Sequence, residues 1–261
     1  MRLFLLSFSL LLAACKPGSQ ERPSASGSDS LIHSASDTRS YLLHQIDLLD
    51  SARAADDYDA LDSINTNIYR GLEKLAKNDA YQIATFSQDD AISYLLSEDK
   101  KLCVVSWDRR TGGTMIDYVA VAIYQTGAGT NVEYFGYDPN TEEIEELQSY
   151  FTKLYGLTDA NGVTTYFAYG FGQGSTMYHW HVLQAFRINA DTLDHTRPTF
   201  DDRDNSILYD LSKFASHNDV KKITFSTDHR QIQVPEVEDE APTGRYNKYH
   251  FSDGIYRRVK Q

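Results

Sequence analysis

Residues 161–188 read NGVTTYFAYGFGQGSTMYHWHVLQAFRI, and this stretch decides the fold. Asn161-Gly162 lies between two runs of alternating side chains, 150–157 and 163–170, and a third such run covers 177–188. An Asn-Gly pair between alternating runs indicates a β-hairpin, because a type I′ turn needs positive φ at both central residues. The glycine-rich segment 170–175 is followed by a strand rather than a helix. We therefore interpret it as a connection and not as a phosphate-binding loop.

The same period of two continues on both sides of this stretch. The predicted strands are 91–96, 102–107, 114–125, 132–137, 150–157, 163–170, 177–188, 206–210, 221–226, 229–234, 245–251 and 255–259. Residues 141–149 are also compatible with a helical turn. Turn residues such as Asp253-Gly254 separate the strands, and the connections are too short for the crossover helices of a parallel sheet. The sequence predicts an antiparallel meander over 91–261, as a curled sheet, a sandwich or a barrel.

Two helices are predicted before the strands, at residues 38–52 and 57–77. The second has apolar residues at steps of three and four, which place them on one helix face: Leu61, Ile64, Ile68, Leu72 and Leu75. Asp56 or Asp57 is suited to cap its start. The predicted fold class is α+β, predominantly antiparallel β with an N-terminal two-helix hairpin (38–78), in a single globular domain spanning 37–261.

The first residues have the layout of an export signal. Arg2 supplies a positive charge, an apolar run extends from Leu3 to Ala14, and Cys15 follows two small residues. The run is shorter than the ~20 residues that a membrane-spanning helix needs. Leu12-Ala13-Ala14-Cys15 resembles the lipobox of bacterial lipoproteins. The alternative is an ordinary secretory signal with a cysteine at this place by chance.

The lipobox resemblance implies that residues 1–14 are removed and that Cys15 becomes a lipidated N-terminus. Two or three acyl chains would hold the protein on a bilayer, because each buried CH₂ contributes ~0.8 kcal/mol. Residues 15–36 are rich in serine, proline and glycine and are predicted to form a flexible linker. Lys16 is not acidic, which in such proteins implies sorting to the outer membrane, facing the periplasm.

Composition limits the partners of the chain. The formal net charge is −12, and loss of Arg2 with the signal leaves 24 basic against 37 acidic residues, or −13. Nucleic-acid binding needs clustered Lys and Arg, so we expect no nucleic-acid partner. With Cys15 acylated, Cys103 is the remaining cysteine and has no partner for an internal disulfide. It shares a predicted strand face with Val105 and Trp107, which favours a buried apolar role.

Trp107, Asp108 and Arg109 form the first candidate ligand-binding site, at the end of a predicted strand and before the turn residues Gly112-Gly113. Trp107 could stack on a sugar or a peptide while Asp108 and Arg109 orient it. The alternative interpretation is structural: the strand ends there and Trp107 belongs to the core.

His179 and His181 form a candidate metal site. Residues i and i+2 of a strand share a face, so both imidazoles could reach one ion. Trp180, Val182 and Phe186 would then face the core. No third ligand is defined by spacing, and the alternative is two histidines on a solvated outer face.

These observations lead to two hypotheses of function. The first is a membrane-anchored envelope lipoprotein that serves as a non-catalytic binding or accessory module in the periplasm, with an envelope protein or the cell wall as partner and no cofactor beyond the lipid on Cys15. The alternative is a metal-dependent hydrolase or metal-binding protein of the envelope that uses His179 and His181. No nucleophile–base pattern identifies catalytic residues.

Overall fold

The chain divides into two units, residues 1–31 and 32–261. A computed structural model describes parts of the second unit: residues 35–77, 79–82, 91–113, 116–139, 141, 149–175, 178–201, 204–211, 222–238 and 241–259. The predicted signal, Cys15, most of the linker and most of segment 141–149 lie outside the described residues. Of the helices in the described ranges, none has the length and apolar character required to cross a membrane.

The helical hairpin forms as predicted, with longer boundaries at its start. Helix α1 covers Ala35–Ala54 and so takes in the last two residues assigned to the linker; helix α2 covers Tyr58–Lys77 and the short helix η1 covers Ala80–Gln82. Asp57 is the residue that caps α2, since its carboxylate accepts a hydrogen bond from the amide of Ala60 at 3.1 Å.

The first sheet has the strand order β1-β2-β3-β4, all antiparallel. Its strands are β1 (Ser93–Leu96), β2 (Leu102–Asp108), β3 (Tyr118–Gln125) and β4 (Thr130–Phe135). Nearly every residue of β2 and β3 is buried, because both faces of these strands are covered. This explains why residues 102–107 read as a continuous apolar run with little alternation.

The second sheet contains the stretch that opens the sequence argument. Its strands are β5 (Tyr150–Thr158), β6 (Thr164–Gln173), β7 (His179–Ile188), β8 (Leu193–Asp194) and β9 (Ser206–Asp210). β5, β6 and β7 pair in sequence order, and both β8 and β9 pair with β7. The two-residue strand β8 was not predicted.

The third sheet has the order β10-β11-β12-β13. Its strands are β10 (Thr224–Phe225), β11 (Gln231–Glu238), β12 (Ala241–Ser252) and β13 (Ile255–Arg258). Asp253 and Gly254 both have positive φ, at 51° and 82°, between the paired residues Ser252 and Ile255. They make the predicted two-residue turn, because a type I′ turn needs this conformation at both positions.

The other predicted hairpin turn is different from the expectation. At Asn161-Gly162 only the glycine has positive φ, at 79°. The amide of Gly162 donates to the carbonyl of Asp159 at 3.1 Å, and the Asp159 carboxylate accepts from the amides of Asn161 and Val163. The hairpin itself is present, but its turn is longer and is organised by an aspartate side chain.

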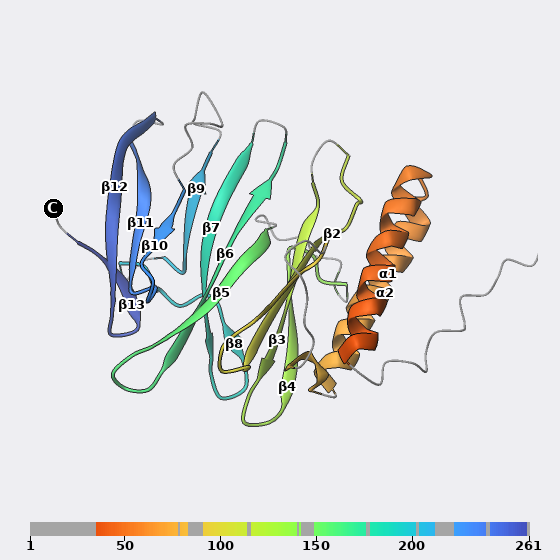
Figure 1. The fold of residues 1–261 in the computed structure, drawn as a ribbon, viewed down its shortest axis with the longest axis horizontal. Helices are drawn as coiled ribbons and strands as arrows, with labels where there is room; N and C mark the ends of the chain where they lie inside the picture. Colours follow the sequence, from red (N-terminus) through yellow and green to blue (C-terminus); the bar gives the residue numbers. More distant parts are fainter. Residues whose placement is uncertain are drawn as a thin grey trace, which may run out of the picture. The chain divides into compact units, whose positions relative to one another are not determined.

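The four layers stack in the order in which they occur along the chain (Figure 1). The helical hairpin packs on one face of the first sheet around Leu72, Cys103 and Trp107. The other face of the first sheet packs on the second sheet through Val104, Ala122 and residues such as Trp180. The third sheet covers the remaining face of the second sheet. The fold is therefore α+β and predominantly antiparallel β, as predicted, and its β part consists of three stacked open sheets.

Candidate functional site

Trp107 lies in the core and not at a rim. Its side chain is 0 % exposed, and its indole Nε1 donates to Oδ1 of Asn65 on α2 at 2.9 Å. The Tyr69 ring meets it edge to face, with 5.1 Å between ring centroids. No face of the indole is open to a ligand, which favours the structural interpretation of this residue over stacking on a sugar or peptide.

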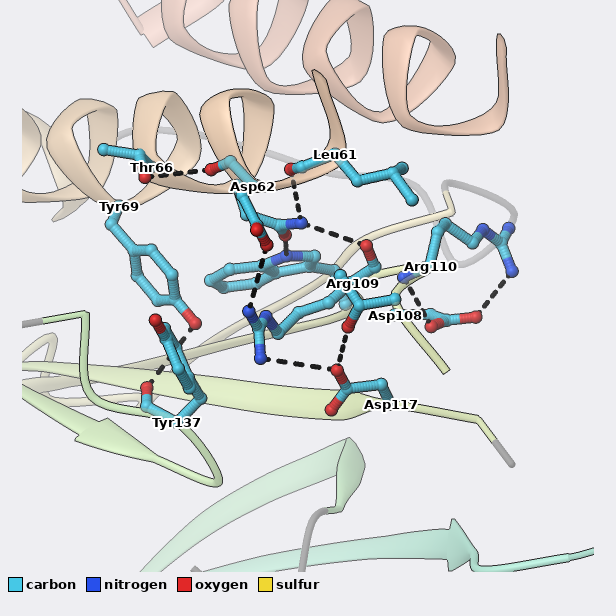
Figure 2. Close-up of polar contacts among 12 residues, drawn as sticks. Leu61, Asp62, Thr66, Tyr69, Asp108, Arg109, Arg110, Asp117 and Tyr137 are labelled. Atoms are coloured by element: carbon cyan, nitrogen blue, oxygen red, sulfur yellow. Dashed lines mark hydrogen bonds and ion pairs between the residues drawn. The ribbon is translucent and has the colours of Figure 1, made fainter. Parts of the chain in front are cut away.

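Arg109 is also buried, with 7 % of its surface exposed. Its guanidinium lies over the Tyr137 ring at 3.7 Å and forms ion pairs with Asp117 at 3.3 Å and with Asp62 of α2 at 3.8 Å (Figure 2). The carbonyl of Arg109 accepts from Nδ2 of Asn65 at 3.0 Å. Arg109 thus joins helix α2 to the end of β2, and its charge is compensated within the protein.

Asp108 points to the opposite side of β2, because successive residues of a strand alternate between faces. Its carboxylate pairs with the Arg110 guanidinium at 2.6 Å and accepts from the Arg110 amide at 2.9 Å. Arg110 in turn contacts Asp50 of α1 at 2.8 Å. Across the strand pair, Asp108 is the direct partner of Tyr118. Of the three residues predicted to form this site, Asp108 alone lies beside a half-exposed surface.

Three aromatic side chains meet beside Asp108, and they come from three different strands. Tyr118 of β3, Tyr150 of β5 and Phe171 of β6 have ring centroids 5.5–5.7 Å apart in every pair. All three are half-buried. Their rings are tilted by 39–88° to one another, as is typical of aromatic clusters. They connect the end of the first sheet to the end of the second, and we call this cluster the aromatic end.

Gly170 permits the strand packing that places Tyr150 and Phe171. A Cβ atom at Gly170 would lie 2.4 Å from the carbonyl oxygen of Tyr150 and 2.8 Å from Cα of Phe151. The pairing of β5 with β6 shifts register next to this point, between Phe151 and Lys153. The bulge brings the β5 backbone against β6, and only glycine leaves enough space for this approach.

His179 and His181 lie on one face of β7, as predicted from their spacing, and Trp180 and Val182 lie on the other, in the core between the first two sheets. His181 is the cross-strand partner of Phe171, so it continues the row that begins at Tyr150. A hollow of about 310 Å³ adjoins the pair and is lined by Phe171, Gly172, His179, Trp180, His181 and Leu211. The two candidate motifs thus border one surface, with Asp108 on one flank and the histidines on the other.

His181 already has a hydrogen-bond partner. Its Nδ1 lies 2.8 Å from the hydroxyl of Tyr169, and the two rings are nearly parallel. Burial, together with the nearby Lys222 charge, lowers the pKa of His181, so the imidazole is neutral near pH 7. Its face is not an outer, solvated one, because the third sheet covers this side of the second sheet. In the described part of the chain no group of three or more His, Cys, Asp or Glu side chains gathers around a possible metal position.

Cys103 is fully buried, and burial raises the pKa of its thiol to about 12. A thiol in this environment stays protonated and is a poor nucleophile. The aromatic end was not predicted from sequence. Its members lie in three separate strands, and the available signal was an aromatic residue near the end of each of these strands.

Searches for related proteins identify no relative that could assign this arrangement to a known activity. No protein-family model matches the chain, and neither the curated proteins nor the solved structures contain a match.

Proposed function

We propose that this protein is a lipid-anchored, non-catalytic binding module of the bacterial cell envelope. The observation that carries the proposal is Leu12-Ala13-Ala14-Cys15, placed directly after a short apolar run with a positive charge before it. A cysteine in this context is the acceptor of the lipid, and two or three acyl chains give stable membrane attachment. The acidic composition is consistent with an envelope protein or cell-wall partner and disfavours nucleic acid.

The aromatic end is the surface that we assign to binding. It combines half-exposed rings, a hollow of about 310 Å³ and flanking polar groups whose positions are fixed by other contacts. Ligand sites commonly consist of an apolar surface with a few well-placed polar groups. The Trp107 cluster, by contrast, is closed and internally paired, so it serves stability.

Membrane attachment is tested by replacing Cys15 with serine in the full-length protein expressed in a bacterial host. We expect the wild type to incorporate labelled palmitate and to stay with the membrane through high-salt and carbonate washes. The Cys15→Ser variant should lose both properties. Cys103→Ala is the matched control, because it removes the other cysteine and leaves the predicted lipid acceptor intact. A Cys15→Ser protein that stays in the washed membrane would contradict the proposal.

Sorting is tested separately by separating inner and outer membranes on a density gradient. Lys16 follows the lipidated cysteine, so we propose an outer-membrane location facing the periplasm. Lys16→Asp is expected to move the protein to the inner-membrane fraction without reducing palmitate incorporation. An unchanged distribution would contradict the assignment of the membrane while leaving the lipid anchor in place.

The alternative of a metal-dependent hydrolase keeps one supporting observation, since His179 and His181 share a face beside the hollow. It is distinguished by metal analysis of the purified full-length protein and of His181→Ala. Retention of about one metal ion per chain in the wild type, lost in His181→Ala, would favour the hydrolase. Equal, negligible metal in both proteins favours the binding module.

A further inference from the structure

We propose that the ligand of the aromatic end is an uncharged saccharide, bound by ring stacking at Tyr118, Tyr150 and Phe171. This inference rests on the proposed function, because it names the class of ligand for the surface assigned there to binding. It follows from three properties of the surface: the arrangement of its rings, the state of its charged flank and the state of its histidine flank.

The rings provide contact area for the apolar face of a sugar. Tyr118, Tyr150 and Phe171 are held in mutual contact at 5.5–5.7 Å between centroids, so they are positioned before a ligand arrives. Aromatic side chains combine a large apolar area with few rotatable bonds, and binding therefore orders little that is not already ordered. The adjoining hollow of about 310 Å³ is at the small end of ligand sites, which fits one or two sugar rings.

The charged flank has no charge to spare for an anion. Arg110 is paired with two carboxylates, Asp108 at 2.6 Å and Asp50 at 2.8 Å. These contacts fix the carboxylate of Asp108 next to Tyr118, its cross-strand partner. A fixed carboxylate accepts hydrogen bonds from hydroxyl groups, whereas a phosphate or carboxylate ligand would be repelled by it and by the net charge of −12.

The histidine flank is neutral as well. Tyr169 engages Nδ1 of His181 at 2.8 Å, and burial keeps the ring uncharged near pH 7. A neutral imidazole offers polar contacts without attracting an anion or a cation. Apolar rings between two polar flanks with no free positive charge are suited to a ring-shaped ligand that carries hydroxyl groups and no charge.

The test uses the full-length protein in detergent, titrated by calorimetry with neutral oligosaccharides of glucose and of N-acetylglucosamine. Trp180 lines the hollow, so its fluorescence provides a second readout. We expect at least one saccharide to bind, and Phe171→Ala to weaken binding about tenfold, as loss of a stacking contact of this size implies. Tyr150→Leu is the second variant, because it removes the aromatic ring and keeps an apolar side chain. Tyr58→Ala, which removes a 50 % exposed tyrosine of α2, should bind as the wild type does.

Circular dichroism and thermal melting of each variant confirm that it is folded before binding is compared. Absence of binding to every neutral saccharide overturns the inference, as does binding that Phe171→Ala and Tyr150→Leu leave unchanged. Binding of heparin or of an uncharged tetrapeptide in place of the neutral saccharides also overturns it, while leaving a binding module in place. The membrane-attachment experiment with Cys15→Ser is independent of all these results, so failure of the anchor and failure of the ligand class are distinguishable.

Discussion

The Trp107 cluster and the aromatic end are built from the same kinds of residues and have opposite properties. Around Trp107, the indole N–H, the amide of Asn65 and the carbonyl of Arg109 satisfy one another inside the core (Figure 2). At the aromatic end, Tyr118, Tyr150 and Phe171 are half-buried and border a hollow. The difference shows that strand register decides which aromatic residue supports the fold and which can meet a ligand, because one residue along a strand changes the face.

The largest effect is expected at the closed cluster. Trp107→Ala should lower the free energy of unfolding by about 3–5 kcal/mol, because it empties a fully buried site between α2 and the first sheet. Urea denaturation followed by circular dichroism measures this loss. A loss below about 1 kcal/mol would show that the cluster is not the closed core described here.

Asn65→Leu should cost about 2 kcal/mol, since it leaves the Trp107 N–H and the Arg109 carbonyl without their partner in a buried place. The same change in a Trp107→Phe background should cost less, because the unsatisfied indole N–H is then absent. Denaturation of the two single variants and the double variant provides this comparison. Strictly additive costs would contradict the role of Asn65 as the partner of the indole.

Stability is expected to fall as pH decreases from 7.5 to 6. Burial lowers the pKa of His181 in the folded protein, whereas the unfolded chain has a value near 6.5. As pH falls through this value the unfolded state takes up a proton that the folded state does not, so stability is lost, by at most ~1.4 kcal/mol per pH unit. His181→Asn should reduce the slope measured by denaturation across this range. The remaining slope is assigned to His229, whose pKa is also lowered by burial and by the nearby Lys153. An unchanged slope would show that His181 is as accessible to protons in the folded protein as in the unfolded chain.

The smallest effect on stability is expected at the aromatic end itself. Tyr118→Ala should cost about 1 kcal/mol, since a half-buried ring contributes less than the ~1.5–3 kcal/mol of a fully buried one. Thermal melting beside Trp107→Ala measures the contrast. Equal costs for the two variants would mean that Tyr118 is a core residue and that the two regions do not differ as described.

The elements of this fold could be predicted from sequence because their signals are local. The apolar steps of α2 and the Asp253-Gly254 turn need only a few neighbouring residues. The three-sheet stacking could not be predicted in this way, since it depends on which faces of distant strands meet. The run from Leu102 to Trp107 carries the one local sign of it, because a strand that is apolar on both faces must be covered twice.

The candidate site was predicted in part. Asp108, His179 and His181 were identified as polar residues near aromatic ones, and the structure places them on two flanks of one surface. The rings between those flanks were missed because Tyr118, Tyr150 and Phe171 are brought together by pairing and packing across three strands. Arg109 was expected at a rim and is buried, because its position on β2 directs it to α2 rather than to the surface.

The layered arrangement has a consequence for how the chain reaches its final form. The first core draws only on residues 42–137, the second on residues 95–193 and the third on residues 155–256. Each core can therefore be completed before the last residues of the chain emerge from a ribosome or an export channel. Such a chain can build itself from the N-terminus outward, one layer on the previous one, with little need to bring its two ends together.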